Sequence, residues 1–346
     1  GLDEKEQYTK IGRIIDEIRE RTGRCIIYNI CRWQFPGSWA AQVADSWRTG
    51  ADIAPEFKSV LHQLDVIKPL ARYCSPGHVN DLDMMQLGKG MSHEDEKTHF
   101  AMWCMMSTPL MIGCDLTKIS ESTLEILKNR ELISVNQDSA CLQAFVIKTA
   151  RSQSGDILGE IWVKDLGKKN SNEKAIAFLN RSEGCLEMSL DFSDAGLTGE
   201  IMSIRDLCDH RDKPCSRMIT VTLRPHETAV YRVMSDSSEE IIDACGTGEY
   251  KEKPLNKISM DAAKRLTAEG AYLADVRSPS EYKKRHLDGA INVPYTEIHA
   301  IAEDFLKDKT RPVIVYCSTG KRSLQAKTSL DYLGYEKVYY LGGIKL

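Results

Sequence analysis

Residues 25–52 read CIIYNICRWQFPGSWAAQVADSWRTGAD, and this stretch decides the fold expected for the first part of the chain. Residues 25–31 form a short apolar run typical of a buried strand, and residues 44–48 are a second candidate for a buried strand. Polar side chains at the carboxyl ends of neighbouring parallel strands are where α/β barrels carry their binding and catalytic groups. The side chains at these two strand ends are Cys31, Arg32, Trp33, Arg48 and Asp52.

The residues around this stretch alternate between helical and strand patterns. Apolar residues recur at helical spacing from Tyr8 to Ile18, and Gly23 is expected to end that helix. Further helices are predicted at 55–64 and 94–106, and further buried strands at 82–87 and 109–114. This alternation over residues 1–140 predicts a parallel sheet with helices outside it.

The rest of the chain changes its pattern twice. Residues 141–234 predict an antiparallel sandwich or barrel, with strands at 159–163, 174–179, 186–192, 200–206, 218–223 and 229–233. Residues 235–254 are polar, charged and glycine-bearing, which is typical of an interdomain linker. Residues 255–346 return to strand–helix alternation and predict a small α/β domain.

Composition excludes several classes of partner. The 346 residues carry a formal net charge of -4, so neither nucleic acid nor a membrane is expected as partner. The first residues, GLDEKEQYTKIGRIIDEIRE, do not resemble a signal peptide. Eleven cysteines without a C-x-x-C pair or a Cys/His cluster predict no metal site and no cofactor. Unpaired cysteines also favour a reducing compartment, and we expect the cytoplasm.

Carboxylates also follow the later predicted strands. Asp81 and Asp83 stand at the start of the predicted strand 82–87, and Asp115 follows 109–114. Carboxylates and arginine bind sugar hydroxyls, and aromatic rings cover the apolar face of a sugar. Each residue alone fits a solvated loop charge or a helix cap, and Asp115 fits a cap for a helix after Thr117. The ordered combination indicates a carbohydrate site.

The order of these motifs resembles the second half of a glycoside hydrolase family 27 α-galactosidase. The similar runs are ICRWQFPGSWA, DSWRTGADI, PGHVNDLDMMQLGKGMSHEDEKTHFAMW, STPLMIGCDL and ISVNQD, continuing into IAFLNRSE and SIRDLCDHRD. The resemblance covers residues 5–234. It implies the last four strands of a (β/α)8 TIM barrel at 1–140 and the family's C-terminal antiparallel β-domain at 141–234.

The resemblance also implies roles for individual residues. Asp52, in the W-R-x-x-x-D motif, matches the general acid/base of retaining hydrolysis of terminal α-galactosyl bonds. Arg48 and Asp83 match residues that bind the sugar, Asp83 within the N-D-x-D-M motif. The other residues implied at the substrate site are Cys31, Arg32, Trp33, Asp81 and Met84. An α-galactoside type of carbohydrate is therefore the expected substrate.

Two departures from the family pattern matter. Arg32 stands where family members commonly have Glu, so galactose is the family default and not a deduction. The family nucleophile is an Asp in a K-x-D motif on the preceding strand, and this sequence has no such motif. Residues 1–140 also fall short of the roughly 200–250 residues of a closed barrel. We therefore expect a catalytically incomplete half-barrel with an open sheet edge, whose other half belongs to a longer parent chain or a separate chain.

A second candidate site lies near the end of the chain. The run YCSTGKRS at 316–323 follows the apolar strand PVIVY and opens a helix. Backbone N–H groups, the helix N-terminus and the charges of Lys321 and Arg322 favour a thiolate at Cys317. A buried, inert cysteine at a strand end is the alternative interpretation.

This segment resembles a single rhodanese domain over residues 257–346. DVRSPSEYKKRHLDGAINVP matches the first family signature, CSTGKR the active loop and YYLGGI the closing strand. The resemblance implies a persulfide on Cys317, cradled by a loop of Ser318, Thr319, Gly320, Lys321 and Arg322. Asp275 and His286 are expected to be structural. A phosphatase loop is the rival interpretation, but it needs five residues between Cys and Arg, and this chain has four.

The sequence therefore supports three interpretations of function. The first is an incomplete α-galactosidase portion fused to a rhodanese sulfurtransferase that uses a small sulfur donor and acceptor. In the second, only the sulfurtransferase works and the glycosidase portion is a remnant or a binding scaffold. In the third, a non-enzymatic interaction module shows neither activity.

Overall fold

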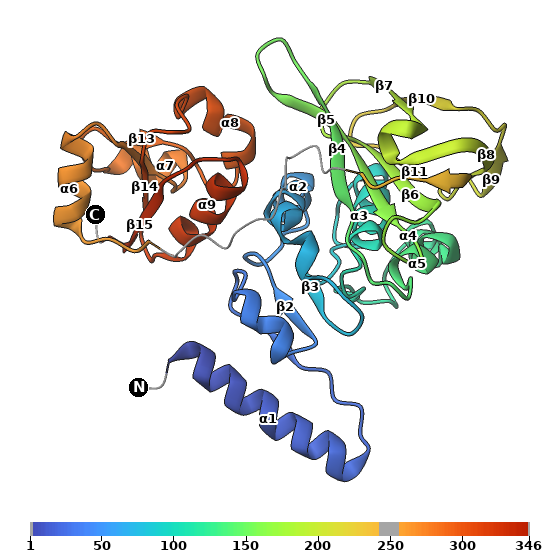
Figure 1. Cartoon of the computed structure of the whole chain (residues 1–346), viewed down its shortest axis with the longest axis horizontal. Helices are drawn as coiled ribbons and strands as arrows, with labels where there is room; N and C mark the ends of the chain where they lie inside the picture. Colours follow the sequence, from blue (N-terminus) through green and yellow to red (C-terminus); the bar gives the residue numbers. More distant parts are fainter. Residues whose placement is uncertain (1–2, 242–255, 345–346) are drawn as a thin grey trace. The chain divides into compact units, whose positions relative to one another are not determined.

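The structure is a computed structural model that describes residues 3–241 and 256–344. It divides into two compact units, of which the first holds most of the residues up to 246 and the second most of the rest. Figure 1 shows a helix and small parallel sheet in blue, an antiparallel domain in green and yellow, and a separate α/β domain in orange and red. No described helix is long and apolar enough to cross a membrane.

The first unit begins with the predicted parallel sheet. Its three strands are β1 (Asn29–Ile30), β2 (Ser46–Arg48) and β3 (Val79–Asp81), in the order β1-β2-β3 and all parallel. The helices of this part are α1 (Glu4–Thr22), η1 (Ser38–Gln42), α2 (Phe57–Ile67), η2 (Lys68–Tyr73), α3 (His93–Met105), α4 (Glu121–Leu127) and α5 (Arg130–Asn136). The sheet confirms the expected partial barrel.

Three of the predicted strands in this part were wrong in extent. Within the run 25–31, only Asn29 and Ile30 pair with the neighbouring strand. Earlier in the run, side chains take up the backbone hydrogen bonds: the Asp45 carboxylate accepts from the Tyr28 N–H, and Arg19 donates to the Ile26 carbonyl. The strand predicted at 82–87 lies earlier, at β3. The strand at 109–114 is reduced to one parallel bridge between Met85 and Ile112.

The first helix forms as predicted and ends at Gly23. Its contact with η1 is narrow: the Tyr8 and Trp39 rings lie 6.2 Å apart, and a Cβ on Gly12 would meet the Val43 carbonyl at 2.7 Å. Ile11 is 45% exposed, and Ile27 in the following loop is 70% exposed. Apolar surface therefore remains open on this part of the unit.

Asp115 does not cap a helix, which was the alternative interpretation of this residue. Asp115 accepts a hydrogen bond from the Thr117 N–H within a turn, and no helix follows it directly. Ser120 is the residue that caps α4, accepting from the Thr123 N–H. A short polar side chain can close either a turn or a helix, and the local sequence does not distinguish the two.

The antiparallel domain confirms all six predicted strands and adds two. The confirmed strands are β5 (Ile157–Asp165), β6 (Glu173–Asn180), β7 (Leu186–Asp191), β8 (Leu197–Asp206), β10 (Met218–Leu223) and β11 (Thr228–Ser238). The added strands are β4 (Phe145–Arg151) and β9 (Arg211–Lys213). The main sheet has the order β4-β5-β6-β11-β8-β9, and β10 pairs with β7 separately. Because β11 runs to Ser238, the predicted linker starts too early, and most of it, 242–255, lies outside the described residues.

The main antiparallel sheet is buried on both faces. On β5, Trp162 packs in one core with α2 and α3, whereas its neighbours Ile161 and Val163 pack in a second core with β7 and β10. Alternate side chains of a strand point to opposite faces, so one strand serves both cores. The partial barrel and the antiparallel domain therefore share a core.

Lys164 on the same strand has an unusually low pKa. It is fully buried, and its ammonium donates to the Val135 carbonyl at 2.5 Å and the Ser107 hydroxyl at 2.7 Å. Burial lowers the pKa of Lys164 to about 8, against about 10.4 in an unfolded chain. Between these values the unfolded chain binds more protons, so the contribution of Lys164 to stability rises with pH.

We therefore expect the stability of the natural chain, relative to a Lys164→Met variant, to rise by about 3 kcal/mol between roughly pH 7 and pH 10.5. Urea unfolding followed by tryptophan fluorescence measures it, because all 5 tryptophans lie in the first unit. Lys118, whose side chain is 81% exposed, supplies the matched control Lys118→Met, for which no such rise is expected. A difference that stays flat with pH would contradict the prediction.

The second unit is a small parallel α/β domain. Its strands are β13 (Ile291–Asn292), β12 (Tyr272–Asp275), β14 (Val313–Cys317) and β15 (Val338–Gly343), in that order and all parallel. Its helices are α6 (Met260–Ala268), α7 (Pro279–Lys284), α8 (Ile298–Phe305) and α9 (Lys321–Tyr332). Alternate residues of β14 enter two separate cores, which is why that strand is apolar throughout.

Candidate functional sites

Four of the predicted residues form one cluster at the carboxyl ends of β2 and β3, here called the Arg48 cluster: Trp33, Arg48, Asp52 and Asp83. One terminal nitrogen of Arg48 lies 2.8 Å from the Asp83 carboxylate and 3.2 Å from that of Asp52. The Trp33 indole donates to the same Asp52 oxygen at 2.9 Å. Residues far apart in sequence thus meet where the parallel strands end.

Asp83 is held rigidly inside this cluster. Its carboxylate accepts the Ile53 N–H at 2.9 Å and the Met84 N–H at 2.7 Å, besides the ion pair with Arg48. Its φ is 84°, a left-handed value that non-glycine residues rarely adopt. Trp103, from α3, donates to the Asp83 carbonyl at 3.0 Å and stabilises this conformation. Strained residues fixed in this way are common at ligand sites.

Asp52 is the accessible carboxylate of the cluster. Its side chain is 73% exposed, whereas those of Arg48 and Asp83 are 8% and 9% exposed. Trp33 beside it is 43% exposed and offers an aromatic face. A carboxylate, a guanidinium and an indole in contact are suited to bind a hydroxylated ligand and to exchange a proton with it.

The remaining predicted residues lie around this cluster in different ways. Asp81 accepts from the Asn29 side chain and from the Asp83 N–H, both at 2.8 Å, and burial raises the pKa of Asp81. Met84 and Cys31 are exposed. Arg32 pairs with Glu4 of α1 at 2.9 Å. The charge of Arg32 is therefore balanced within the chain.

The cysteine loop has the geometry expected of an anion cradle. The Cys317 sulfur is buried at the end of β14 and accepts the Gly320 N–H at 3.1 Å and the Ser323 N–H at 3.3 Å. Gly320 has a φ of 91°, which lets the loop turn into α9. A Cβ on Gly343 of β15 would meet the Ser318 carbonyl at 2.8 Å, so the closing strand needs glycine there.

One partner in this loop was not expected from the sequence. Glu281 binds the Arg322 guanidinium through both carboxylate oxygens, at 2.6 and 2.8 Å, and accepts from the Ser318 hydroxyl at 3.3 Å. Arg322 holds the pKa of Glu281 at about 2. Ser278 and Glu281 form a capping box on α7, and this S-x-x-E spacing is the signal that could have located Glu281. The side chain of Lys321 lies outside what the structure describes.

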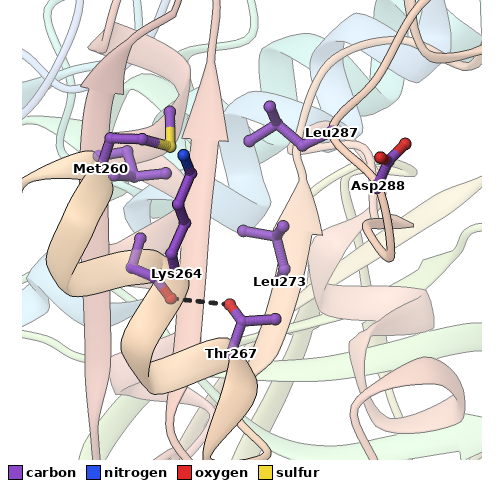
Figure 2. Close-up of a pocket in the computed structure, with 8 residues that line it drawn as sticks. Met260, Lys264, Thr267, Leu273, Leu287 and Asp288 are labelled. Atoms are coloured by element: carbon purple, nitrogen blue, oxygen red, sulfur yellow. Dashed lines mark hydrogen bonds between the residues drawn. The ribbon is translucent and has the colours of Figure 1, made fainter.

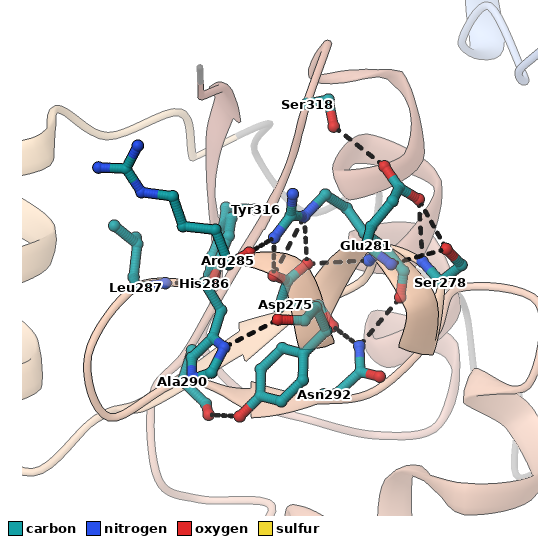
Figure 3. Close-up of polar contacts among 12 residues, drawn as sticks. Asp275, Ser278, Glu281, Arg285, His286, Leu287, Ala290, Asn292, Tyr316 and Ser318 are labelled. Atoms are coloured by element: carbon teal, nitrogen blue, oxygen red, sulfur yellow. Dashed lines mark hydrogen bonds and ion pairs between the residues drawn. The ribbon is translucent and has the colours of Figure 1, made fainter. Parts of the chain in front are cut away.

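Figure 3 shows the contacts of Asp275 and His286, the two residues for which structural roles are predicted. Asp275 is buried and pairs with Arg277 at 2.6 Å. His286 approaches the Tyr282 carbonyl at 2.9 Å through Nδ1 and stacks on the Tyr282 ring. Neither residue contacts Cys317 in a described interaction.

A cavity of about 300 Å³ lies elsewhere in the second unit, shown in Figure 2. Its walls are mostly apolar, with Lys264 and Asp288 as the charged groups, and none of its lining residues belongs to the cysteine loop. Within residues 3–241 and 256–344, no group of three or more His, Cys, Asp or Glu side chains has the arrangement of a metal site.

Comparisons with known proteins assign each part of the chain to a family. Residues 2–138 match the family model "Alpha galactosidase A", and residues 159–233 match "Alpha galactosidase C-terminal beta sandwich domain". Residues 259–345 match "Rhodanese-like domain".

Curated relatives and solved structures agree with these matches. Alpha-galactosidase 2 of Arabidopsis thaliana is 32% identical over 236 residues, covering 67% of this chain and 56% of the plant protein. Alpha-galactosidase A of Cellvibrio japonicus is 37% identical over 186 residues, covering 50% of this chain and 44% of that protein. The chain thus spans about half the length of these relatives.

The crystal structure of α-galactosidase I from Mortierella vinacea has the same fold, with a TM-score of 0.60 and 24% identity. The superposition covers 68% of this chain and 64% of that chain. Residues 2–138 and 159–233 therefore belong to the α-galactosidase (melibiase) family, and residues 259–345 form a rhodanese-like domain.

Proposed function

We propose that Cys317 accepts a sulfane sulfur and passes it on as a persulfide, so that the rhodanese-like domain is a working sulfurtransferase. The observation that supports this most directly is the pair of N–H groups, from Gly320 and Ser323, aimed at the Cys317 sulfur at the start of α9. Backbone donors at a helix N-terminus stabilise a negative charge, such as that of the thiolate or of an ionised persulfide.

Intact mass spectrometry tests this proposal directly. The purified chain is incubated with thiosulfate, and separately with glutathione persulfide, and then desalted. We expect a mass gain of one sulfur atom that dithiothreitol removes and that maps to the peptide containing Cys317. A chain that gains no sulfur from either donor would refute the proposal.

For the first unit we propose that Asp52 acts as the general acid/base half of an α-galactosidase-like site, with Arg48 and Asp83 binding the sugar. The accessible carboxylate of Asp52 beside a buried arginine supports this assignment. Retaining hydrolysis also needs a nucleophilic carboxylate about 5–5.5 Å from the acid. Of the nearby described carboxylates, Asp83 is bound to Arg48 and two N–H groups, and Asp81 to Asn29 and one N–H. We therefore propose that these residues alone form an incomplete catalytic site.

The expected result is no release of p-nitrophenol from p-nitrophenyl α-galactoside by this chain alone. The reason is that a glycosyl–enzyme intermediate needs a free second carboxylate. An Asp52→Asn variant is the control, because any true turnover must fall when the acid/base is lost. Turnover by the natural chain that Asp52→Asn abolishes would contradict the prediction.

A further inference from the structure

The strongest unassigned feature is the ion pair between Glu281 and Arg322, directly beside the sulfur site. The carboxylate of Glu281 accepts from both terminal nitrogens of Arg322 and from the Ser318 hydroxyl, and Figure 3 shows Glu281 reaching Ser318 and Ser278. Arg322 also approaches Ser318 at 3.2 Å. Both terminal nitrogens of the guanidinium are therefore engaged by neighbouring residues.

The same pair lies close enough to the sulfur to set its electrostatic surroundings. Ser318 directly follows Cys317 in the chain, and its hydroxyl lies 3.3 Å from the Glu281 carboxylate and 3.2 Å from the Arg322 guanidinium. The Cys317 sulfur itself is contacted by the Gly320 and Ser323 N–H groups and the Ser323 hydroxyl, and by no described cationic side chain. The positive charge of Arg322 is thus cancelled locally by Glu281.

The known kinds of sulfur donor differ in the charge they bring to this site. Attack of the Cys317 thiolate on the outer sulfur of thiosulfate forms a Cys317 persulfide, breaks the donor S–S bond and releases the electron pair with sulfite. The thiolate carries one negative charge and thiosulfate carries two, so the reacting groups carry three in total. Attack on a protonated organic persulfide, R–S–SH, forms the same bond, keeps the proton on the transferred sulfur and releases R–S⁻. That reaction carries one negative charge.

We propose that Glu281 is a specificity-determining residue that makes this site favour organic persulfides over thiosulfate. This inference rests on the proposed sulfurtransferase function. A neutralised guanidinium offers little attraction to a dianion, whereas two N–H donors and the start of α9 suffice for a single negative charge. Glu281 acts through Arg322 and takes no part in the bonds that form or break.

A Glu281→Gln variant tests the proposal. Glutamine keeps the shape of the side chain and an oxygen for the α7 cap, but it no longer cancels the charge of Arg322. We expect the ratio of kcat/KM for thiosulfate to kcat/KM for glutathione persulfide to rise about three- to tenfold, through a lower KM for thiosulfate. The rise should shrink as ionic strength increases, because salt screens the freed charge.

The matched control is Glu303→Gln. Glu303 lies on α8 and pairs with Lys309 at 2.6 Å, a distance similar to that of the Glu281–Arg322 pair. The variant therefore removes one carboxylate from an ion pair that is not among the described contacts of the cysteine loop. The donor ratio should not move in this variant.

The outcomes separate the two claims. If the natural chain takes sulfur from neither donor, the proposed function fails. If it takes sulfur but Glu281→Gln leaves the donor ratio unchanged, or lowers kcat for both donors equally, Glu281 only holds the loop in shape and the specificity inference is overturned.

Discussion

Replacement of Cys317 by serine is expected to abolish thiocyanate formation from thiosulfate in the presence of cyanide. The loss should exceed about a thousandfold, because a serine hydroxyl is not ionised near neutral pH and the covalent intermediate cannot form. Serine keeps the size of the side chain, so the buried environment at the end of β14 should survive. The measurement is colorimetric thiocyanate release at matched protein concentration.

The control for this experiment is Cys185→Ser. Cys185 is an exposed free thiol in the first unit, so it reports on adventitious thiol chemistry. Activity should be the same as in the natural chain. Thiocyanate formation that persists in Cys317→Ser and disappears in Cys185→Ser would refute the assignment of the persulfide to Cys317.

The second large effect is expected in a buried cluster of four charges that joins the partial barrel to the antiparallel domain: Asp65, Lys68, Glu160 and Arg181. Lys68 lies 2.6 Å from Asp65 and 2.5 Å from Glu160, and Arg181 lies 2.7 Å and 2.9 Å from the same carboxylates. All four side chains are less than one-tenth exposed. The two positive charges hold the pKa of Glu160 below its usual value.

A Glu160→Gln variant should lower the free energy of unfolding of the first unit by about 3–5 kcal/mol. It leaves two buried cations to share one carboxylate, and an uncompensated buried charge is strongly unfavourable. Urea unfolding followed by tryptophan fluorescence again measures the loss, because every tryptophan lies in this unit.

Glu173→Gln is the matched control for Glu160→Gln. Glu173 pairs with Arg232 at 2.6 Å on the same sheet, but both side chains are more than 30% exposed. Removing such a pair should cost less than about 1 kcal/mol. If the two variants lost the same free energy of unfolding, burial would not be the reason that the four-charge cluster stabilises the first unit.

Much of the fold follows from local sequence patterns. Period-two runs located six strands of the antiparallel domain, because alternate residues of each strand must enter a core. The missed strands β4 and β9 are short or largely exposed, so their own residues carry little of that pattern, and pairing with β5 and β8 creates them. Pairing depends on partners elsewhere in the chain.

The predicted strand boundaries were wrong where side chains take up the backbone hydrogen bonds. At Asp83, a left-handed φ ends the extended chain inside the run predicted as a strand. That conformation depends on Arg48, Ile53 and Trp103, which lie 20 or more residues away. The hydrophobic pattern within residues 82–87 therefore cannot predict these contacts.

The same distinction applies to the two sites. The sequence motifs, through the family resemblances they carry, predicted Asp52, Arg48 and Asp83 as one group and Cys317 as the centre of another. Only the tertiary structure joined Arg32 to Glu4, and Glu281 to Arg322 across 41 residues. Ion pairs between distant residues depend on how helices and strands approach one another. The sequence by itself therefore determined which residues are candidates for each site, whereas the tertiary structure decided which of their charges are paired with other residues of the chain.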